Sequence, residues 1–71
     1  KLSYKDQREL DGLPAEIEGL EISISEISGQ ISEPGFYQTD RAAIEVVEGQ
    51  LANAQKQLAE SYARWELLEN Q

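Results

Sequence analysis

Residues 10–31, LDGLPAEIEGLEISISEISGQI, place an apolar side chain at every third or fourth position. The steps alternate between three and four residues, which is the spacing of one face of an α-helix. The pattern keeps a seven-residue repeat and forms a narrow stripe, as in a coiled-coil seam, whereas helices of globular domains usually have a wider apolar face. The stripe consists of Leu10, Leu13, Ile17, Leu20, Ile24, Ile27 and Ile31.

The second half of the chain repeats this spacing over residues 44–68. Only Ser61 departs from the apolar rule, and we expect the neighbouring Tyr62 to cover that layer. Between the stripes, Pro34 and Gly35 favour a turn, because proline fixes φ and glycine adopts conformations that other residues resist. The second stripe consists of Ile44, Val47, Leu51, Ala54, Leu58, Ser61, Trp65 and Leu68.

Two striped helices joined by a short loop predict an antiparallel hairpin. We therefore expect an all-α fold, an antiparallel two-helix coiled-coil hairpin with a short extra N-terminal helix. The short helix is separated from the next because Gly12 weakens a helix and Pro14 is favourable at the start of a new one, which indicates a break or a kink. The expected elements of this single domain are a short helix at 4–11, a long helix at 14–31, a turn at 32–39 and a long helix at 40–69.

The ends of these helices carry recognisable signals. Ser3 and Asp6 have the spacing of a capping box at the start of the first helix. Residues 36–37 are too apolar for a free linker, so we expect them to fold back as a lid through a short 3₁₀ turn. Thr39 or Asp40 is then placed to cap the second long helix.

The register of the hairpin has two candidate solutions. Antiparallel pairing requires paired residue numbers to share a constant sum. A sum of 71 pairs Leu13 with Leu58 and is centred on the loop, which makes it the preferred solution. A sum of 78 pairs Leu13 with Trp65 and stays open.

Composition excludes several classes of function. The chain has 71 residues, a net charge of −8, and no His, Cys or Met. The chain therefore cannot form a disulfide or a structural zinc site built from Cys and His. It also has no thiol nucleophile and no His general base. No apolar run approaches the length of about 18 residues that spans a membrane. We expect no catalytic residue, metal site or cofactor here, and Lys1 in place of Met favours a piece of a longer chain.

The basic residues are unevenly distributed. Residues 1–8 carry a net charge of +2, whereas residues 9–71 carry three positive and thirteen negative charges, or −10. Helical spacing places Lys5 and Arg8 on one face, with Lys1 if the helix reaches it. An antiparallel hairpin brings Arg64 back beside them. These four residues form the candidate nucleic-acid-binding site, because cations that neutralise phosphates provide most nucleic-acid affinity.

Each of these features has a simpler interpretation. Charge placement alone favours ordinary ion pairs of the basic residues with Asp6, Glu9 and Glu66. Aromatic side chains at or beside a seam can form a stacking platform for bases, but they more often fill a core. The aromatic residues concerned are Tyr4, Tyr62 and Trp65.

Several segments resemble the C-terminal domain of the Uup-type ABC-F ATPases. The opening residues 1–10, KLSYKDQREL, and the following residues 13–14, LP, carry the most specific part of the resemblance. The turn at 34–37 with Asp40 after it, and the closing residues 64–69, RWELLE, are also similar to this family. The match runs from end to end, and the heptad stretches between these segments are generic.

The resemblance implies a longer cytoplasmic protein with two ATP-binding cassettes, which would use ATP and magnesium, and no membrane domain. It implies that this domain is associated with DNA binding and supports the ATPase. We expect DNA or structured RNA, such as ribosomal RNA, as the nucleic acid bound. We expect a monomer, with a ribosomal protein or the ATPase cassettes as alternative partners. The alternative function is a protein-interaction or spacer coiled coil that positions the cassettes on the ribosome or on a partner protein.

Overall fold

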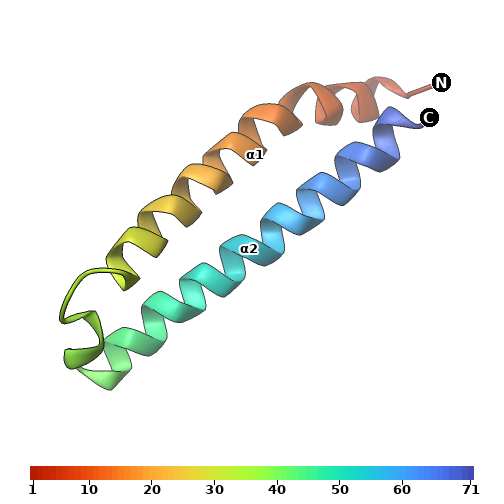
Figure 1. The fold of residues 1–71 in the computed structure, drawn as a ribbon. Helices are drawn as coiled ribbons and strands as arrows, with labels where there is room; N and C mark the ends of the chain where they lie inside the picture. The colour runs from red at the N-terminus through yellow and green to blue at the C-terminus, as the bar shows by residue number, and fades with distance from the viewer.

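The computed structural model describes residues 1–71 and contains two long antiparallel helices that lie side by side (Figure 1). Helix α1 spans Tyr4–Ile31 and helix α2 spans Arg41–Glu69, and the short 3₁₀ helix η1, Phe36–Gln38, lies between them. The molecule is a rod with extents of 53 × 16 × 15 Å, and its two termini meet at one end. The expected all-α antiparallel hairpin is confirmed. Neither helix combines the length and apolar character that crossing a membrane requires.

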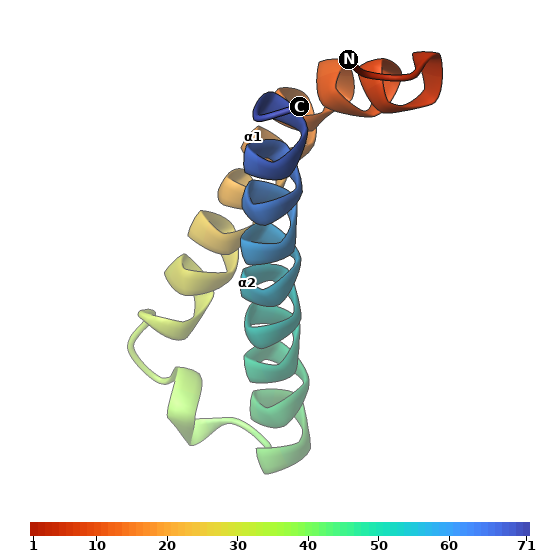
Figure 2. The same ribbon diagram turned by 90° about the vertical axis from the view of Figure 1, so that its right-hand side faces the viewer.

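The start of α1 is capped as expected, but the helix is longer than expected. The side-chain oxygen of Ser3 accepts a hydrogen bond of 3.1 Å from the backbone N–H of Asp6. The helix then continues through Pro14 to Ile31, so the segment expected as a separate helix is its first part. Figure 2 shows this first part bending away from the rest of α1. Proline lacks an N–H and crowds the carbonyl one turn earlier, which bends a helix without always ending it.

The turn adopts the expected 3₁₀ conformation. Gly35 precedes η1 with φ of 92°, a left-handed conformation that side chains disfavour. Phe36 is half-buried and packs edge-on against Tyr37, with ring centroids 4.9 Å apart. Tyr37 itself is exposed and donates a hydrogen bond of 3.3 Å to Glu48. Only the phenylalanine therefore contributes to the lid that the sequence predicts.

The second long helix begins without a side-chain cap. Asp40 occupies the N-cap position, yet its side chain makes no capping hydrogen bond. The hydroxyl of Thr39 instead donates a 2.6 Å hydrogen bond to the carbonyl of Phe36 and so stabilises the turn. Asp40 is thus the N-cap residue, as one of the two expected candidates, but it makes no side-chain capping hydrogen bond, and Thr39 is used within the loop.

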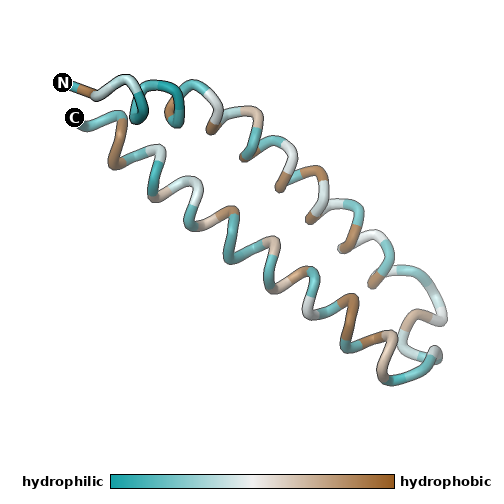
Figure 3. The backbone as a smooth tube through the Cα atoms, turned by 180° about the vertical axis from the view of Figure 1, so that it is seen from behind, coloured by the Kyte–Doolittle hydropathy of each residue, from teal (hydrophilic) through white to brown (hydrophobic).

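The core is a single narrow row of side chains between the helices. Figure 3 shows apolar segments recurring along both helices, with those of α1 on the side toward α2. Only five residues are buried, and most other members of the two stripes are half-buried. The off-stripe Ile22 and Leu67 are each 53% exposed. The buried residues are Leu13, Ile17, Ala54, Ser61 and Leu68.

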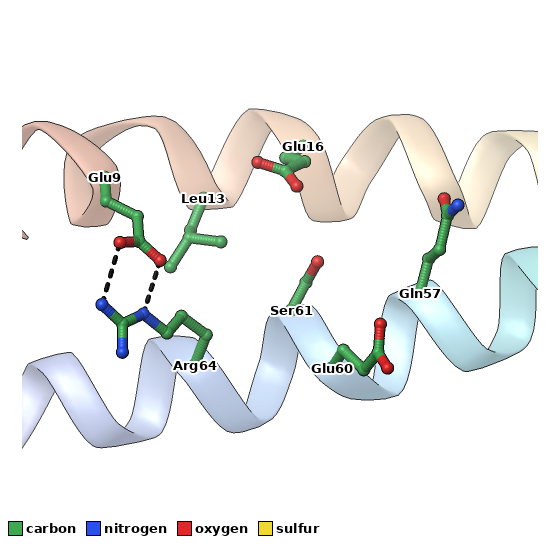
Figure 4. Close-up of a pocket in the computed structure, with 7 residues that line it drawn as sticks. All are labelled: Glu9, Leu13, Glu16, Gln57, Glu60, Ser61 and Arg64. Carbon is green, nitrogen blue, oxygen red and sulfur yellow. Dashed lines mark hydrogen bonds and ion pairs between the residues drawn. The ribbon is translucent and has the colours of Figure 1, made fainter.

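The register along the straight part of the hairpin follows the larger of the two candidate sums. The hydroxyl of Tyr62 donates a 2.9 Å hydrogen bond to Glu21. A sum of 71 would place Tyr62 opposite Glu9, about 18 Å along the helix from Glu21, whereas a sum of 78 places it opposite Glu16, about 7.5 Å away. Figure 4 likewise shows Glu16 across from Ser61. The preference for 71 is therefore wrong in this part of the molecule.

Candidate nucleic-acid interface

Three of the four candidate basic residues are free at one end of the hairpin. Because Ser3 is the N-cap, Lys1 lies before α1, whereas Lys5 and Arg8 lie within its first turns and three residues apart. All three are exposed, and the ion pairs of the chain, which involve Arg41 and Arg64, include none of them. We call Lys1, Lys5 and Arg8 the cationic end.

An exposed aromatic ring lies within the cationic end. Tyr4 is 78% exposed, and the guanidinium carbon of Arg8 lies 5.9 Å from the centroid of its ring. This distance lies just within the limit of about 6 Å for a cation–π contact. The interpretation of Tyr4 as a core residue is therefore wrong. Trp65, by contrast, is half-buried and its ring centroid lies 6.4 Å from that of Tyr62.

Arg64 reaches this end of the molecule as predicted, but its guanidinium group is already paired with carboxylates of the chain (Figure 4). Its Nε donates to Glu9 Oε2 at 2.6 Å and its Nη2 donates to Glu9 Oε1 at 3.0 Å. A second ion pair joins it to Asp6 at 3.6 Å. The two parallel bonds to one carboxylate are the strong, planar arrangement that arginine favours. The ion-pair interpretation therefore holds for Arg64 with Asp6 and Glu9, while Glu66 takes no part.

This ion pair changes the acidity of both partners. The hydrogen bond from Arg64 lowers the pKa of Glu9 below its usual 4.5, and burial opposes that change. The same hydrogen bond is the main reason that the pKa of Arg64 is raised. The side chain of Arg64 is 41% exposed and that of Glu9 is 36% exposed, so solvent screens the pair. It nevertheless links the first part of α1 to the last part of α2, which fixes the base of the hairpin.

Acid should remove the contribution of this pair. Because folding lowers the pKa of Glu9, the pair stabilises the fold above the usual pKa of 4.5, and its contribution is lost as the pH falls through the lowered value. We expect the melting temperature of wild type to exceed that of Glu9→Gln at neutral pH, and the difference to shrink below pH 4.5. The control is Glu18→Gln, on an exposed residue in no ion pair. A difference that stays constant through acid would contradict this account.

The bend in α1 displaces the cationic end to one side of the paired helices. The first turns of α1, red in Figure 2, project to one side of the two paired helices. Glu9, the first acidic residue of the −10 segment, still interacts electrostatically with Lys5. The bend therefore changes the direction in which the +2 segment projects, while its nearest carboxylate stays close.

Comparison with known proteins identifies the class of domain. The chain matches the family described as the ABC transporter C-terminal domain over residues 1–70. The chain therefore belongs to the family of ABC transporter C-terminal domains. The resemblance of its opening, turn and closing segments to the Uup type is consistent with this assignment.

The similar curated proteins are Uup proteins. The chain is 39% identical over 69 residues to a protein of Haemophilus influenzae named ATP-binding protein Uup-like. The aligned region covers 97% of this chain and 15% of that relative. The chain is 39% identical to ATP-binding protein Uup of the same organism and 36% identical to that of Escherichia coli, covering 97% of this chain and 11% of each relative. The chain thus spans a small part of these relatives. No solved structure matches it.

Proposed function

We propose that this chain is the C-terminal accessory domain of a Uup-type ABC ATP-binding protein and that its cationic end binds nucleic acid. The names of the relatives, ATP-binding protein Uup, support the ATP-binding part of this proposal. The chain itself has no glycine-rich phosphate-binding loop with a following lysine, so ATP and magnesium belong to other parts of such a protein. We place the protein in the cytoplasm and expect this domain to act as a monomer.

One observation carries the nucleic-acid proposal. The cationic end combines three exposed and unpaired cations with the exposed ring of Tyr4. Basic groups bind phosphates without regard to sequence, and an aromatic face beside them stacks on unpaired bases. DNA and structured RNA both offer phosphates to the cations, and unpaired bases in single-stranded segments or loops are available to Tyr4, so both are candidate ligands. Arg64 is left out of the binding surface, because Asp6 and Glu9 already neutralise it.

The salt dependence of binding tests this proposal. Labelled duplex DNA and an RNA hairpin of equal length are titrated with the chain at several salt concentrations, and fluorescence anisotropy gives the affinity. Neutralising up to three phosphates predicts a slope of log affinity against log salt of about −2 to −3. The variant K5E/R8E is expected to show no measurable binding, since it reverses two of the three free cations.

The matched control changes the same charge elsewhere. Arg41 lies at the opposite end of the rod and Lys56 lies in the middle of α2, so R41E/K56E alters net charge equally. We expect this variant to keep affinity within a few-fold of wild type. Equal losses in both double variants would show that only overall charge matters. Wild-type affinity in K5E/R8E would refute the proposed site.

A further inference from the structure

A groove between the helices lies beside the Arg64–Glu9 ion pair and outside the cationic end (Figure 4). It has a volume of about 250 Å³, and both helices line it. Leu13 is its only apolar lining residue, and Glu16 from α1 and Glu60 from α2 border it from opposite sides. Neither of these glutamates forms an ion pair within the chain. The groove therefore carries two uncompensated negative charges.

Ser61 is a second, independent feature of this groove. It occupies a seam position where every other member of the second stripe is apolar, and only 8% of it is exposed. Its hydroxyl lines the groove and points toward α1 (Figure 4), and no other group of the chain hydrogen-bonds with it. The chain has no fully buried side-chain nitrogen or oxygen that lacks a hydrogen-bond partner, so the Ser61 hydroxyl is accessible from the groove although most of the residue is buried. It is therefore available to a hydrogen-bonding group that enters the groove.

The chemistry of the lining selects the ligand. An ammonium group has three hydrogen-bond donors and no acceptor, which fits two carboxylates and one hydroxyl. The chain has no group of three acidic side chains that could hold a metal ion. The volume of the groove is below the usual range of about 300–1,000 Å³ for sites of drug-sized ligands. A single side chain of a partner protein therefore fits the groove better than a drug-sized molecule does. The net charge of −10 on residues 9–71 favours a basic protein and repels nucleic acid.

We infer that this groove binds a lysine side chain of a basic protein partner. The ammonium group lies between Glu16 and Glu60 and donates to Ser61 Oγ, and the aliphatic stem packs against Leu13. Arg64 remains paired with Glu9 and closes one end of the groove. This site is separate from the cationic end, so the domain has one surface for an anionic ligand and another for a cationic one.

A peptide titration tests the inference. The ¹⁵N-labelled chain is titrated with a capped peptide of alternating lysine and alanine, with the arginine counterpart of that peptide, and with spermidine. We expect the lysine peptide to shift the amide signals of Leu13, Gln57 and Ser61. The variant E16Q/E60Q should weaken its binding about tenfold, since two exposed charged contacts are removed. The control E18Q/E69Q removes the same charge outside the groove and should change affinity less than twofold.

Ser61→Ala separates a binding role from a purely structural one. Alanine is the better helix former, so the melting temperature should rise. If Ser61 contacts the ligand, the same variant also weakens the lysine peptide several-fold. Unchanged peptide affinity in this variant, equal weakening by E16Q/E60Q and its control, or equal binding of the arginine peptide would overturn the inference. Tighter binding of spermidine at the same amides would also overturn it, in favour of a free polyamine.

Discussion

Replacing Ile17 by alanine is expected to unfold most of the molecule at 25 °C. Only four apolar residues are buried, and Ile17 is 5% exposed at the middle of that row. Truncating a buried isoleucine to alanine costs about 2–5 kcal/mol, and a core of this size rarely supplies more than about 3–5 kcal/mol in total. The loss is therefore comparable to the whole free energy of unfolding.

Ile22 provides a matched control on the same helix. It is 53% exposed and lies off the stripe, so Ile22→Ala should change the free energy of unfolding by less than about 1 kcal/mol. The milder Ile17→Val keeps the fold and should cost about 0.5–1.5 kcal/mol, which gives a measurable value when Ile17→Ala is unfolded. Urea unfolding followed by circular dichroism measures all three. Similar effects of the two alanine variants would contradict the proposed core.

Replacing Gly19, Gly29 and Gly49 together by alanine is expected to stabilise the hairpin strongly. All three lie within helices, and a Cβ at each would meet nothing within 4 Å. Glycine in a helix interior is less favourable than alanine by about 1 kcal/mol, and well-separated sites add. The triple variant should gain about 3 kcal/mol, which corresponds to a rise in melting temperature on the order of 10–20 °C.

Gly35 should respond in the opposite direction. Its φ of 92° is a left-handed conformation, which costs a residue with a Cβ about 1–2 kcal/mol. Gly35→Ala should therefore lower the melting temperature, although the substitution is chemically the same as in the helices. Thermal unfolding followed by circular dichroism compares the melting temperature of the triple variant with that of Gly35→Ala. A destabilised triple variant would show that the helices do not have the open surface described, and an unaffected Gly35→Ala would show that the turn is different.

The helices and the turn could be predicted because they depend on local properties. The three-four spacing over residues 10–31 sets the buried face of α1, and Pro34 with Gly35 marks the reversal. The bend in α1 was predicted only as a break or kink, because proline permits either outcome. α1 bends rather than ends at Pro14, and the part of α1 that follows Pro14 packs along α2.

The register and the site depended on contacts between distant residues. Both candidate sums satisfy the apolar stripes, and the hydrogen bond between Tyr62 and Glu21 distinguishes them. The sequence placed Arg64 correctly at the base of the hairpin, but the position of Glu9 across the seam decides that it is neutralised. Exposure of Tyr4 likewise follows from the bend, which no periodicity reveals.

Binding of nucleic acid at the cationic end is tested most directly by an amide titration of the ¹⁵N-labelled chain with short duplex DNA at low salt. We expect shifts in the first residues and the first turns of α1, around Lys1, Lys5 and Arg8, with the amide signals of the acidic body unchanged. We also expect these shifts to vanish as salt is raised, because phosphate contacts release counterions. Shifts spread along α2, or none in the first turns of α1, would contradict the claim that the cationic end binds nucleic acid.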